Sequence, residues 1–201
     1  MKKIIGLFFS LFFGSANAAI IDFEDVAVGS GVNSIVTSVI SNGFSFTTSL
    51  NHMHLVNDNF TTWNGTTYLG NDRTTSSLTM TSTSGSLFSL NQLDIGEFFV
   101  SNAETISILG VGGSSPLLSF VTDGIADGSG AGVDFETIFF GAGWSNLTAV
   151  TFTNSFNSGA FSLDNIVVNE SERESVPEPA SLALLGLGLA GLGFTRKKKT
   201  I

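Results

Sequence analysis

Hydrophobic and polar residues alternate with a period of two in many short segments of the chain. Ile21–Glu24 and Gly43–Thr47 both show it, with isoleucine or phenylalanine at every second position. Successive side chains of a strand point to opposite faces, so this period predicts strands with one buried face. The same reasoning predicts further strands at Leu78–Met80, Phe88–Leu90, Leu93–Val100, Thr105–Leu109, Leu117–Val121, Val133–Phe140, Leu147–Thr153 and Phe161–Val168.

Turn signals separate these segments, among them Asn64-Gly65, Ser84-Gly85 and the glycine-rich stretch Asp127–Gly132. The region between them is rich in Ser, Thr, Gly, Asn and Phe, a composition that disfavours helices and favours short strands. About ten short strands at regular spacing predict one all-β domain, an antiparallel sandwich or barrel.

The N-terminus has a different pattern. Lys2 and Lys3 precede a largely apolar stretch from Ile4 to Phe13, and Ala16-Asn17-Ala18 follows. Positive charge, a short apolar core and a small-x-small triplet form a secretory signal peptide. We therefore expect residues 1–18 to be a signal helix that is cleaved after Ala18, and the protein to be exported.

The C-terminus carries a second processing pattern. Pro177, Glu178 and Pro179 precede the uncharged apolar run 180–194, and the basic cluster Arg196, Lys197, Lys198 and Lys199 follows. Proline cannot continue a helix, so the triplet marks where a hydrophobic helix begins. Fifteen residues span roughly 22 Å, against about 30 Å for a hydrocarbon core, which is short for a permanent membrane anchor.

This order of elements resembles the PEP-CTERM sorting signal of Gram-negative bacteria. The match covers Val176–Ile201, with the VPEP motif, the Gly/Leu/Ala-rich helix and the basic end. The resemblance implies transient insertion of residues 180–194 in the inner membrane, cleavage near the motif by an exosortase-type enzyme, and delivery to the cell surface or an extracellular exopolysaccharide matrix. The alternative is a simple C-terminal membrane anchor.

Removing both signals changes the charge of the chain. Only Arg73 and Arg173 remain as basic residues, against sixteen acids, so the formal net charge falls from −9 to −14. Such a surface repels phosphate backbones, which excludes nucleic acid as a partner. It attracts divalent cations and, through them, anionic polysaccharide, although acidity can also serve solubility alone. The chain has no cysteine, so no disulfide supports the domain.

A second resemblance concerns the region between the signals. The segments Ile21–Asp25, Asn64–Leu69, Ser86–Phe98 and Trp144–Val168 resemble the jelly-roll, galactose-binding-like sandwich that often precedes PEP-CTERM tails. The resemblance implies a β-sandwich ectodomain at 19–169. A short charged linker at 170–175 would join it to the sorting signal at 176–201.

The jelly-roll resemblance also implies a structural Ca²⁺ between the first and last strands. Asp22 and Glu24 share one strand face by their i, i+2 spacing, and Asp164 occupies the matching place in the last strand. Carboxylate oxygens without cysteine suit calcium rather than zinc. The alternative is that Asp22 and Glu24 form the solvated face of an edge strand.

Two other segments contain potential metal ligands. His52 and His54 would lie on one face of an extended segment, a workable transition-metal spacing, but the only third ligand nearby in sequence is Asp58. Surface positions in a loop are the alternative. Asp123–Asp134 lacks the alternating acids of an EF-hand loop, so we expect a loop between strands.

Exposed aromatic rings are candidates for stacking on sugars. Trp63 and Tyr68 flank the turn Asn64-Gly65 in a polar segment and form the best such pair, whereas Trp144 at a strand entrance is expected to pack in the core or its rim. They are the candidate carbohydrate-binding residues.

Catalytic signatures are missing from the sequence, which contains neither GxSxG nor HExxH and has only two histidines. We therefore expect a noncatalytic exported protein of the exopolysaccharide or biofilm matrix. It would either bind carbohydrate, with a structural calcium, or act as a purely structural, glycosylated component. A glycoside hydrolase is the least favoured alternative.

Overall fold

The computed structural model describes residues 18–28, 33–57, 65–72, 76–98, 103–125, 135–154 and 160–169. The contacts divide the chain into residues 1–170 and 171–201, and every described residue belongs to the first unit. The predicted signal helix, the PEP motif and the hydrophobic segment 180–194 lie outside the described residues. Among the described residues, no helix has the length and apolar character needed to cross a membrane.

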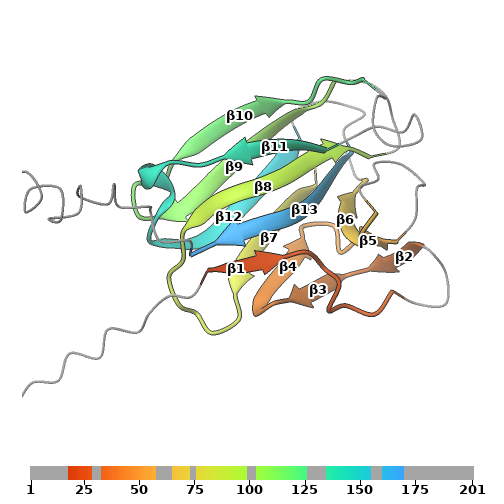
Figure 1. The fold of residues 1–201 in the computed structure, drawn as a ribbon, viewed down its shortest axis with the longest axis horizontal. Coiled ribbons are helices and arrows are strands. Elements are labelled where there is room, and N and C mark those ends of the chain that lie inside the picture. Colours follow the sequence, from red (N-terminus) through yellow and green to blue (C-terminus); the bar gives the residue numbers. More distant parts are fainter. Residues whose placement is uncertain are drawn as a thin grey trace, which may run out of the picture. The chain divides into compact units, whose positions relative to one another are not determined.

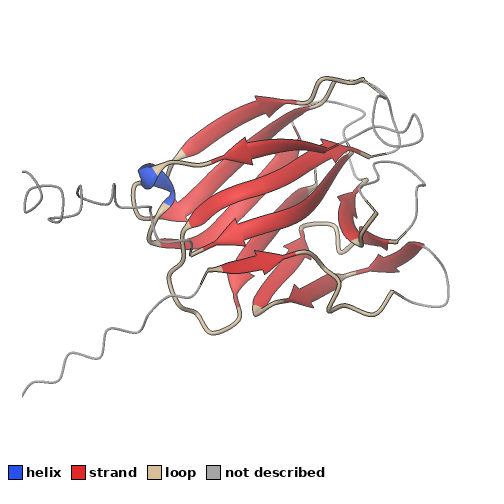
Figure 2. Ribbon diagram, viewed as in Figure 1, coloured by secondary structure: helices blue, strands red, loops and turns tan. Residues whose placement is uncertain are grey.

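Two antiparallel sheets make up the described fold (Figures 1 and 2). Sheet A has the order β11-β8-β13-β6-β5-β2, with β1 also paired to β13. Its strands are β1 (Ala19–Ile21), β2 (Asn33–Val36), β5 (Met53–Val56), β6 (Tyr68–Asn71), β8 (Leu90–Glu97), β11 (Phe135–Phe139) and β13 (Phe161–Val168).

Sheet B has the order β10-β9-β12-β7-β4-β3. Its strands are β3 (Ser38–Ser41), β4 (Phe44–Thr48), β7 (Ser77–Ser82), β9 (Thr105–Gly112), β10 (Leu117–Val121) and β12 (Leu147–Asn154). In the described part of the chain the helical structure is a single 3₁₀ turn, η1 (Ala142–Trp144), which ends at the buried Trp144. The predicted antiparallel β-sandwich is confirmed.

The main core lies between the two sheets and follows the alternation in sequence. On β7, Leu78 and Met80 are fully buried while the serines and threonines between them are not. Leu163 of β13 and Ile108 of β9 belong to the same apolar cluster, so both sheets contribute one face to it. Trp144 packs edge-on against Phe140, with the ring centroids 4.7 Å apart, as the predicted core or rim position requires.

A smaller apolar cluster covers the other face of sheet A. Val56, Tyr68, Phe98 and Ala160 form it, with Phe135 packed against it, and we call it the outer cluster. On β6, Leu69 faces the main core while the adjacent Tyr68 faces the outer cluster. Because neighbouring strand residues point to opposite faces, sheet A is apolar on both sides at this end.

The strand predictions succeeded where alternation was clear and failed elsewhere. β10 and β13 have the predicted bounds, whereas β2, β3, β5 and β6 were not predicted. All four residues of both β5 and β6 are buried, so these strands show no alternation. The predicted segment Phe88–Leu90 is not a separate strand, since Phe88 makes an isolated bridge to Leu147 and Leu90 begins β8.

Candidate functional site

The residues of the predicted calcium site lie where the first and last strands meet. β1 pairs with β13 as the jelly-roll resemblance implied. β1 ends at Ile21, however, and Phe23 has a left-handed backbone with φ 58°, so Asp22 and Glu24 are not the alternating face of a strand. That detail of the prediction is wrong because the chain turns directly after Ile21.

Asp164 and Glu24 are nevertheless linked through two neighbouring residues. Thr66 Oγ1 donates to Asp164 Oδ2 at 2.8 Å, and the backbone N–H of Thr67 donates to Glu24 Oε1. Asp164 is fully buried and also accepts from the backbone N–H of Asn165 at 2.8 Å. Asp22 accepts a hydrogen bond from the backbone of Glu24. Hydrogen bonds to the adjacent Thr66 and Thr67 therefore bring Asp164 and Glu24 into one region, and a Ca²⁺ bound by Asp22, Glu24 and Asp164 remains a prediction.

Of the predicted sugar-stacking residues Trp63 and Tyr68, the structure describes Tyr68 and does not support its role. Tyr68 is fully buried in the outer cluster, with its ring edge-on to those of Phe98 and Phe135 at centroid distances of 6.4 and 5.8 Å. A ring that stacks on a sugar needs an exposed face, so the assignment of Tyr68 is corrected to packing. Trp63 lies outside the described residues.

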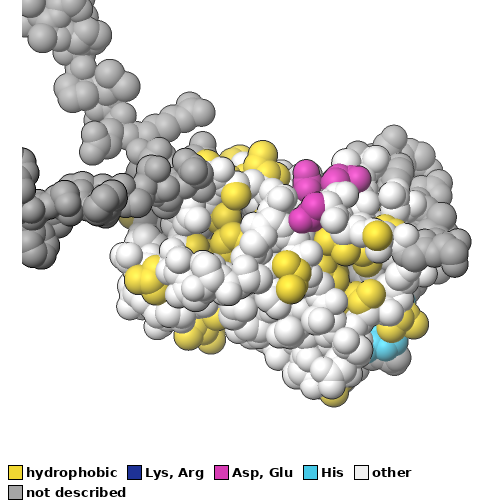
Figure 3. All heavy atoms as spheres, turned by 90° about the horizontal axis from the view of Figure 1, so that it is seen from below, with side chains coloured by type: hydrophobic (Ala, Val, Ile, Leu, Met, Phe, Trp, Pro, Cys, Tyr) yellow, Lys and Arg dark blue, Asp and Glu magenta, His cyan; other side chains and the backbone are white. Residues whose placement is uncertain are grey.

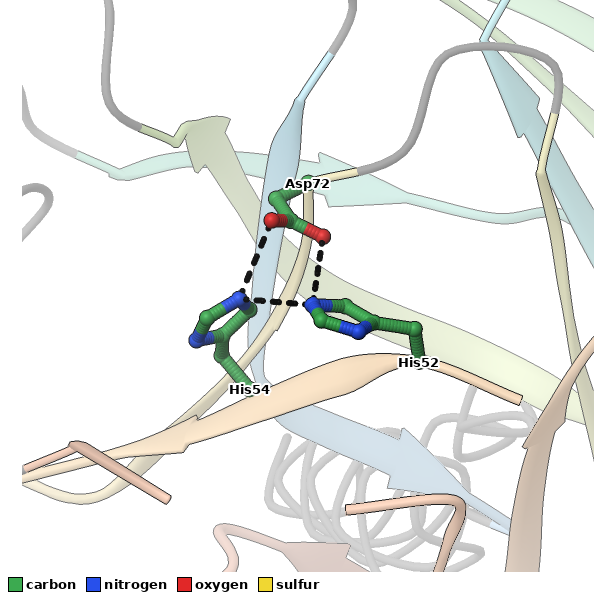
Figure 4. A group of neighbouring side chains, drawn as sticks. All are labelled: His52, His54 and Asp72. Atoms are coloured by element: carbon green, nitrogen blue, oxygen red, sulfur yellow. Dashed lines mark hydrogen bonds and ion pairs between the residues drawn. The ribbon is translucent and has the colours of Figure 1, made fainter. Parts of the chain in front are cut away.

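The structure brings His52, His54 and Asp72 together as a group that we call the histidine cluster (Figure 4). His52 Nε2 lies 3.4 Å from Asp72 Oδ1, His54 Nε2 lies 3.1 Å from Asp72 Oδ2, and the two Nε2 atoms lie 3.3 Å apart. Asn33 Oδ1 lies 2.8 Å from His54 Nδ1.

Strand register explains this convergence. β5 and β6 are antiparallel, and His54 lies opposite Gly70. Continuing that register by two residues places His52 opposite Asp72, on the same face as His54 because all these steps are even. Phe98 packs beside the group, its ring centroid 5.2 Å from that of His54. The predicted common face of the two imidazoles is thus retained, and Asp72 is the third member that the sequence did not reveal.

Glu97, Asp123 and Glu136 form a second group, the carboxylate cluster. Glu97 ends β8, Glu136 lies on β11, and Asp123 follows β10 of the other sheet. The backbone N–H of Gly124 donates to Glu97 Oε1 at 2.8 Å, and that of Asp123 donates to Glu136 Oε1 at 2.7 Å. These contacts tie the chain after β10 to the edge of sheet A.

Burial changes the acidity of the carboxylate cluster. It raises the pKa of Glu136 to about 7, and the charges of Glu97 and Asp123 act in the same direction, while the hydrogen bond from Asp123 opposes them. Glu136 is therefore partly protonated near neutral pH. Sequence reasoning singled out Asp123 only as the start of a loop and missed both glutamates, because their strands adjoin only in the folded sheet.

A carboxylate near β1 behaves in the opposite way. Burial acts to raise the pKa of Asp25, but hydrogen bonds from the backbone of Asn42 at 2.8 Å and the hydroxyl of Ser41 at 2.5 Å outweigh it. The pKa of Asp25 therefore lies below its usual range. Both donors stabilise the ionised carboxylate.

The described surface is acidic without basic residues. In the ranges that the structure describes, none of the side chains is Lys or Arg. On the face drawn in Figure 3, acidic side chains gather in one patch beside scattered hydrophobic ones. Anionic polymers would therefore meet a repulsive surface here unless a cation lies between.

Comparison with solved structures gives distant likenesses. The module CBM32 of AlyQ in complex with 4,5-unsaturated mannuronic acid shares 17% identity, with 67% of this chain and 97% of that chain covered and a TM-score of 0.37. A mutant of CBM29-2 with mannohexaose shares 12%, covering 81% and 98%, at a TM-score of 0.43. The K2 cleaved adhesin domain of Lys-gingipain shares 11%, covering 77% and 98%, at 0.41.

At these identities and TM-scores, nothing about this chain is inferred from those structures. No match was found among curated proteins. The family model of the PEP-CTERM protein-sorting motif matches residues 175–198, which coincide with the apolar and basic tail described above. The chain is therefore an antiparallel β-sandwich followed by a PEP-CTERM sorting motif.

Proposed function

We propose that the protein is a noncatalytic surface or matrix protein, exported through the inner membrane and processed by an exosortase-type enzyme. The match of the PEP-CTERM motif at 175–198 carries the proposal. The folded sandwich ends before this motif, so cleavage near Pro177–Pro179 would leave the described fold intact. The delivered part would then reside on the cell surface or in the exopolysaccharide matrix.

Mass spectrometry of the mature protein tests this sorting directly. We expect an N-terminus at Ala19 and a C-terminus near the PEP motif, with the hydrophobic and basic segments removed. A mature chain that retains Lys199 would contradict processing and leave a plain membrane-anchored protein. Deletion of the exosortase gene in the producing bacterium should leave the precursor uncleaved.

For the delivered sandwich we infer weak carbohydrate binding, with exopolysaccharide as the ligand class. Its described surface has no cationic side chain, so an anionic polysaccharide would require a bridging divalent cation. Trp63 remains the candidate stacking residue, since the ring of Tyr68 is buried. A structural Ca²⁺ at Asp22, Glu24 and Asp164 would link the turn after β1, which contains Asp22 and Glu24, to Asp164 of β13.

Retention on the producer's own exopolysaccharide, with and without a calcium chelator, tests the binding. Trp63→Ala should reduce retention, while Phe139→Ala, which changes another exposed aromatic residue, should not. Glu24→Gln should abolish any rise in Tm caused by Ca²⁺. If the wild-type protein is not retained at all, the structural and glycosylated matrix role replaces carbohydrate recognition. Shortening of the polysaccharide would instead indicate a hydrolase.

A further inference from the structure

The histidine cluster contains both histidines of the chain. They approach a single carboxylate from one side, with three potential ligand atoms within 4.8 Å of one another (Figure 4). The cluster is shielded from water, since the side chains of His52, His54 and Asp72 are 19%, 8% and 16% exposed. Two imidazoles and a carboxylate are ligands that zinc accepts, and no cysteine is involved.

The spacing of the cluster fits a tetrahedral metal ion. Zinc binds imidazole nitrogen and carboxylate oxygen at about 2.0–2.1 Å, so two ligands at a tetrahedral angle lie about 3.3 Å apart. The two Nε2 atoms lie 3.3 Å apart, His52 Nε2 lies 3.4 Å from Asp72 Oδ1, and His54 Nε2 lies 3.1 Å from the other carboxylate oxygen, Oδ2. A cation between these atoms would need little rearrangement of the side chains.

Asn33 determines which ring nitrogen of His54 carries the proton. Asn33 Oδ1 is an acceptor, so the ring nitrogen Nδ1 of His54 donates to it at 2.8 Å. In the neutral imidazole this leaves Nε2 as an acceptor. That lone pair then faces an oxygen of the Asp72 carboxylate, another acceptor, at 3.1 Å. Two acceptors at this distance repel each other unless a proton or a metal ion lies between them.

The same contact is the arrangement that metal sites use to orient a histidine. A ligating imidazole donates its second N–H to an oxygen of the protein, which sets the tautomer and aims the other nitrogen at the metal. The packing of Phe98 on His54 limits rotation of the ring further. The second-layer support that a zinc site requires is therefore present around His54.

We propose that His52 Nε2, His54 Nε2 and the carboxylate of Asp72 bind a zinc ion, with a water or an exogenous ligand completing its coordination. The ion would join the residue before β5 to the residue after β6, opposite positions in the continued register of these strands. Such a link would stabilise a chain that has no disulfide. The cluster shares no residue with the predicted calcium ligands Asp22, Glu24 and Asp164.

The test uses the full chain, purified without an affinity tag in detergent, stripped with a chelator and then titrated with zinc chloride. We expect one zinc ion per chain by calorimetry and elemental analysis. At zinc concentrations about a hundred times Kd, the Tm should rise by about 5–10 °C. Calcium chloride at the same concentration serves as the control ion, because calcium prefers oxygen ligands.

Three variants decide whether the cluster is the site. His52→Ala and Asp72→Asn should each remove the zinc-dependent rise in Tm, and Asp25→Asn, a carboxylate elsewhere on the surface, should keep it. His52 is the safer variant, because it precedes β5 and is the most exposed of the three. The proposal is overturned if zinc leaves the wild-type Tm unchanged, which indicates a metal-free His–Asp ion pair, or if His52→Ala binds zinc as tightly as wild type.

Discussion

The histidine cluster and the carboxylate cluster are built on the same end of sheet A but differ in their donor atoms. The register that pairs Asn71 with Phe161, and Phe161 with Glu97, aligns the end of β6 with the end of β8. Asp72 directly follows the first of these strands, and Glu97 ends the second. Each cluster thus forms where a strand ends beside its neighbours.

The donor atoms give the two clusters different chemistry. Nitrogen donors dominate the first, and nitrogen suits transition metals. The second has only oxygen donors, and burial beside like charges raises the pKa of Glu136 to about 7. One cluster is therefore suited to a metal ion and the other to a proton near neutral pH. The comparison shows that a common scaffold determines where polar groups meet, while residue type decides what they bind.

Phe98 of the outer cluster lies next to residues of both groups. The ring of Phe98 contacts His54 and Tyr68, and the residue directly follows Glu97. Replacing it with alanine removes a fully buried ring, so we expect Phe98→Ala to lower the free energy of unfolding by about 3–5 kcal/mol. Denaturant unfolding measures this loss.

The matched control for Phe98→Ala is Phe139→Ala, since Phe139 is 76% exposed and should change stability little. An asymmetry between the clusters is expected as well, because the ring of Phe98 packs on His54 of the histidine cluster. Zinc affinity should fall in Phe98→Ala, while the titration of Glu136 should persist. Equal losses in both clusters would show that they are not independent.

Gly70 offers a smaller perturbation at the same place. A Cβ at this position would lie 2.5 Å from the ring of Phe98, so Gly70→Ala forces the ring away. Overpacking of this kind costs about 1–3 kcal/mol. Gly141→Ala is the control, since its Cβ would meet nothing within 4 Å. If the two variants unfold at the same denaturant concentration, the packing of Phe98 on β6 is wrong.

Stability should depend on pH through Glu136. The folded protein binds this proton more tightly than the unfolded chain, whose pKa stays near 4.5. The resulting stabilisation is complete below pH 4.5 and is lost as the pH rises through about 7. Glu136→Gln keeps the protonated shape, so its Tm should exceed that of wild type at pH 8 and match it near pH 4. A Tm difference that does not change between these pH values would contradict the raised pKa.

Replacing Asp25 should give the smallest change in Tm, with a pH dependence opposite to that of the Glu136 variant. The folded-state pKa of Asp25 lies below the unfolded value of 3.8, so its contribution is present above that pH and is lost as the pH falls through the folded pKa. Asp25→Asn should lower the Tm slightly at pH 7 and not at all near pH 2. Measured together, Glu136→Gln and Asp25→Asn distinguish a carboxyl group whose charged form is destabilised by folding from one whose charged form is stabilised.

The success of the fold prediction depended on how local the signal was. β7 and β12 alternate clearly because one face of each strand packs in the core. β5 and β6 are buried on both faces. Each has four residues, and their sequence shows no alternation of hydrophobic and polar positions. The strands beside the histidine cluster were therefore among those that the pattern missed.

Sequence alone determined the C-terminal sorting motif, the class of the fold and the common face of His52 and His54, because each depends on residues that are adjacent or close in the chain. Only the tertiary structure decided that Asp72 joins the histidines, that Tyr68 is buried, and that Glu97 and Glu136 meet Asp123. Those contacts depend on strand register between segments far apart in the chain, and register is set by the packing of whole faces rather than by any local pattern.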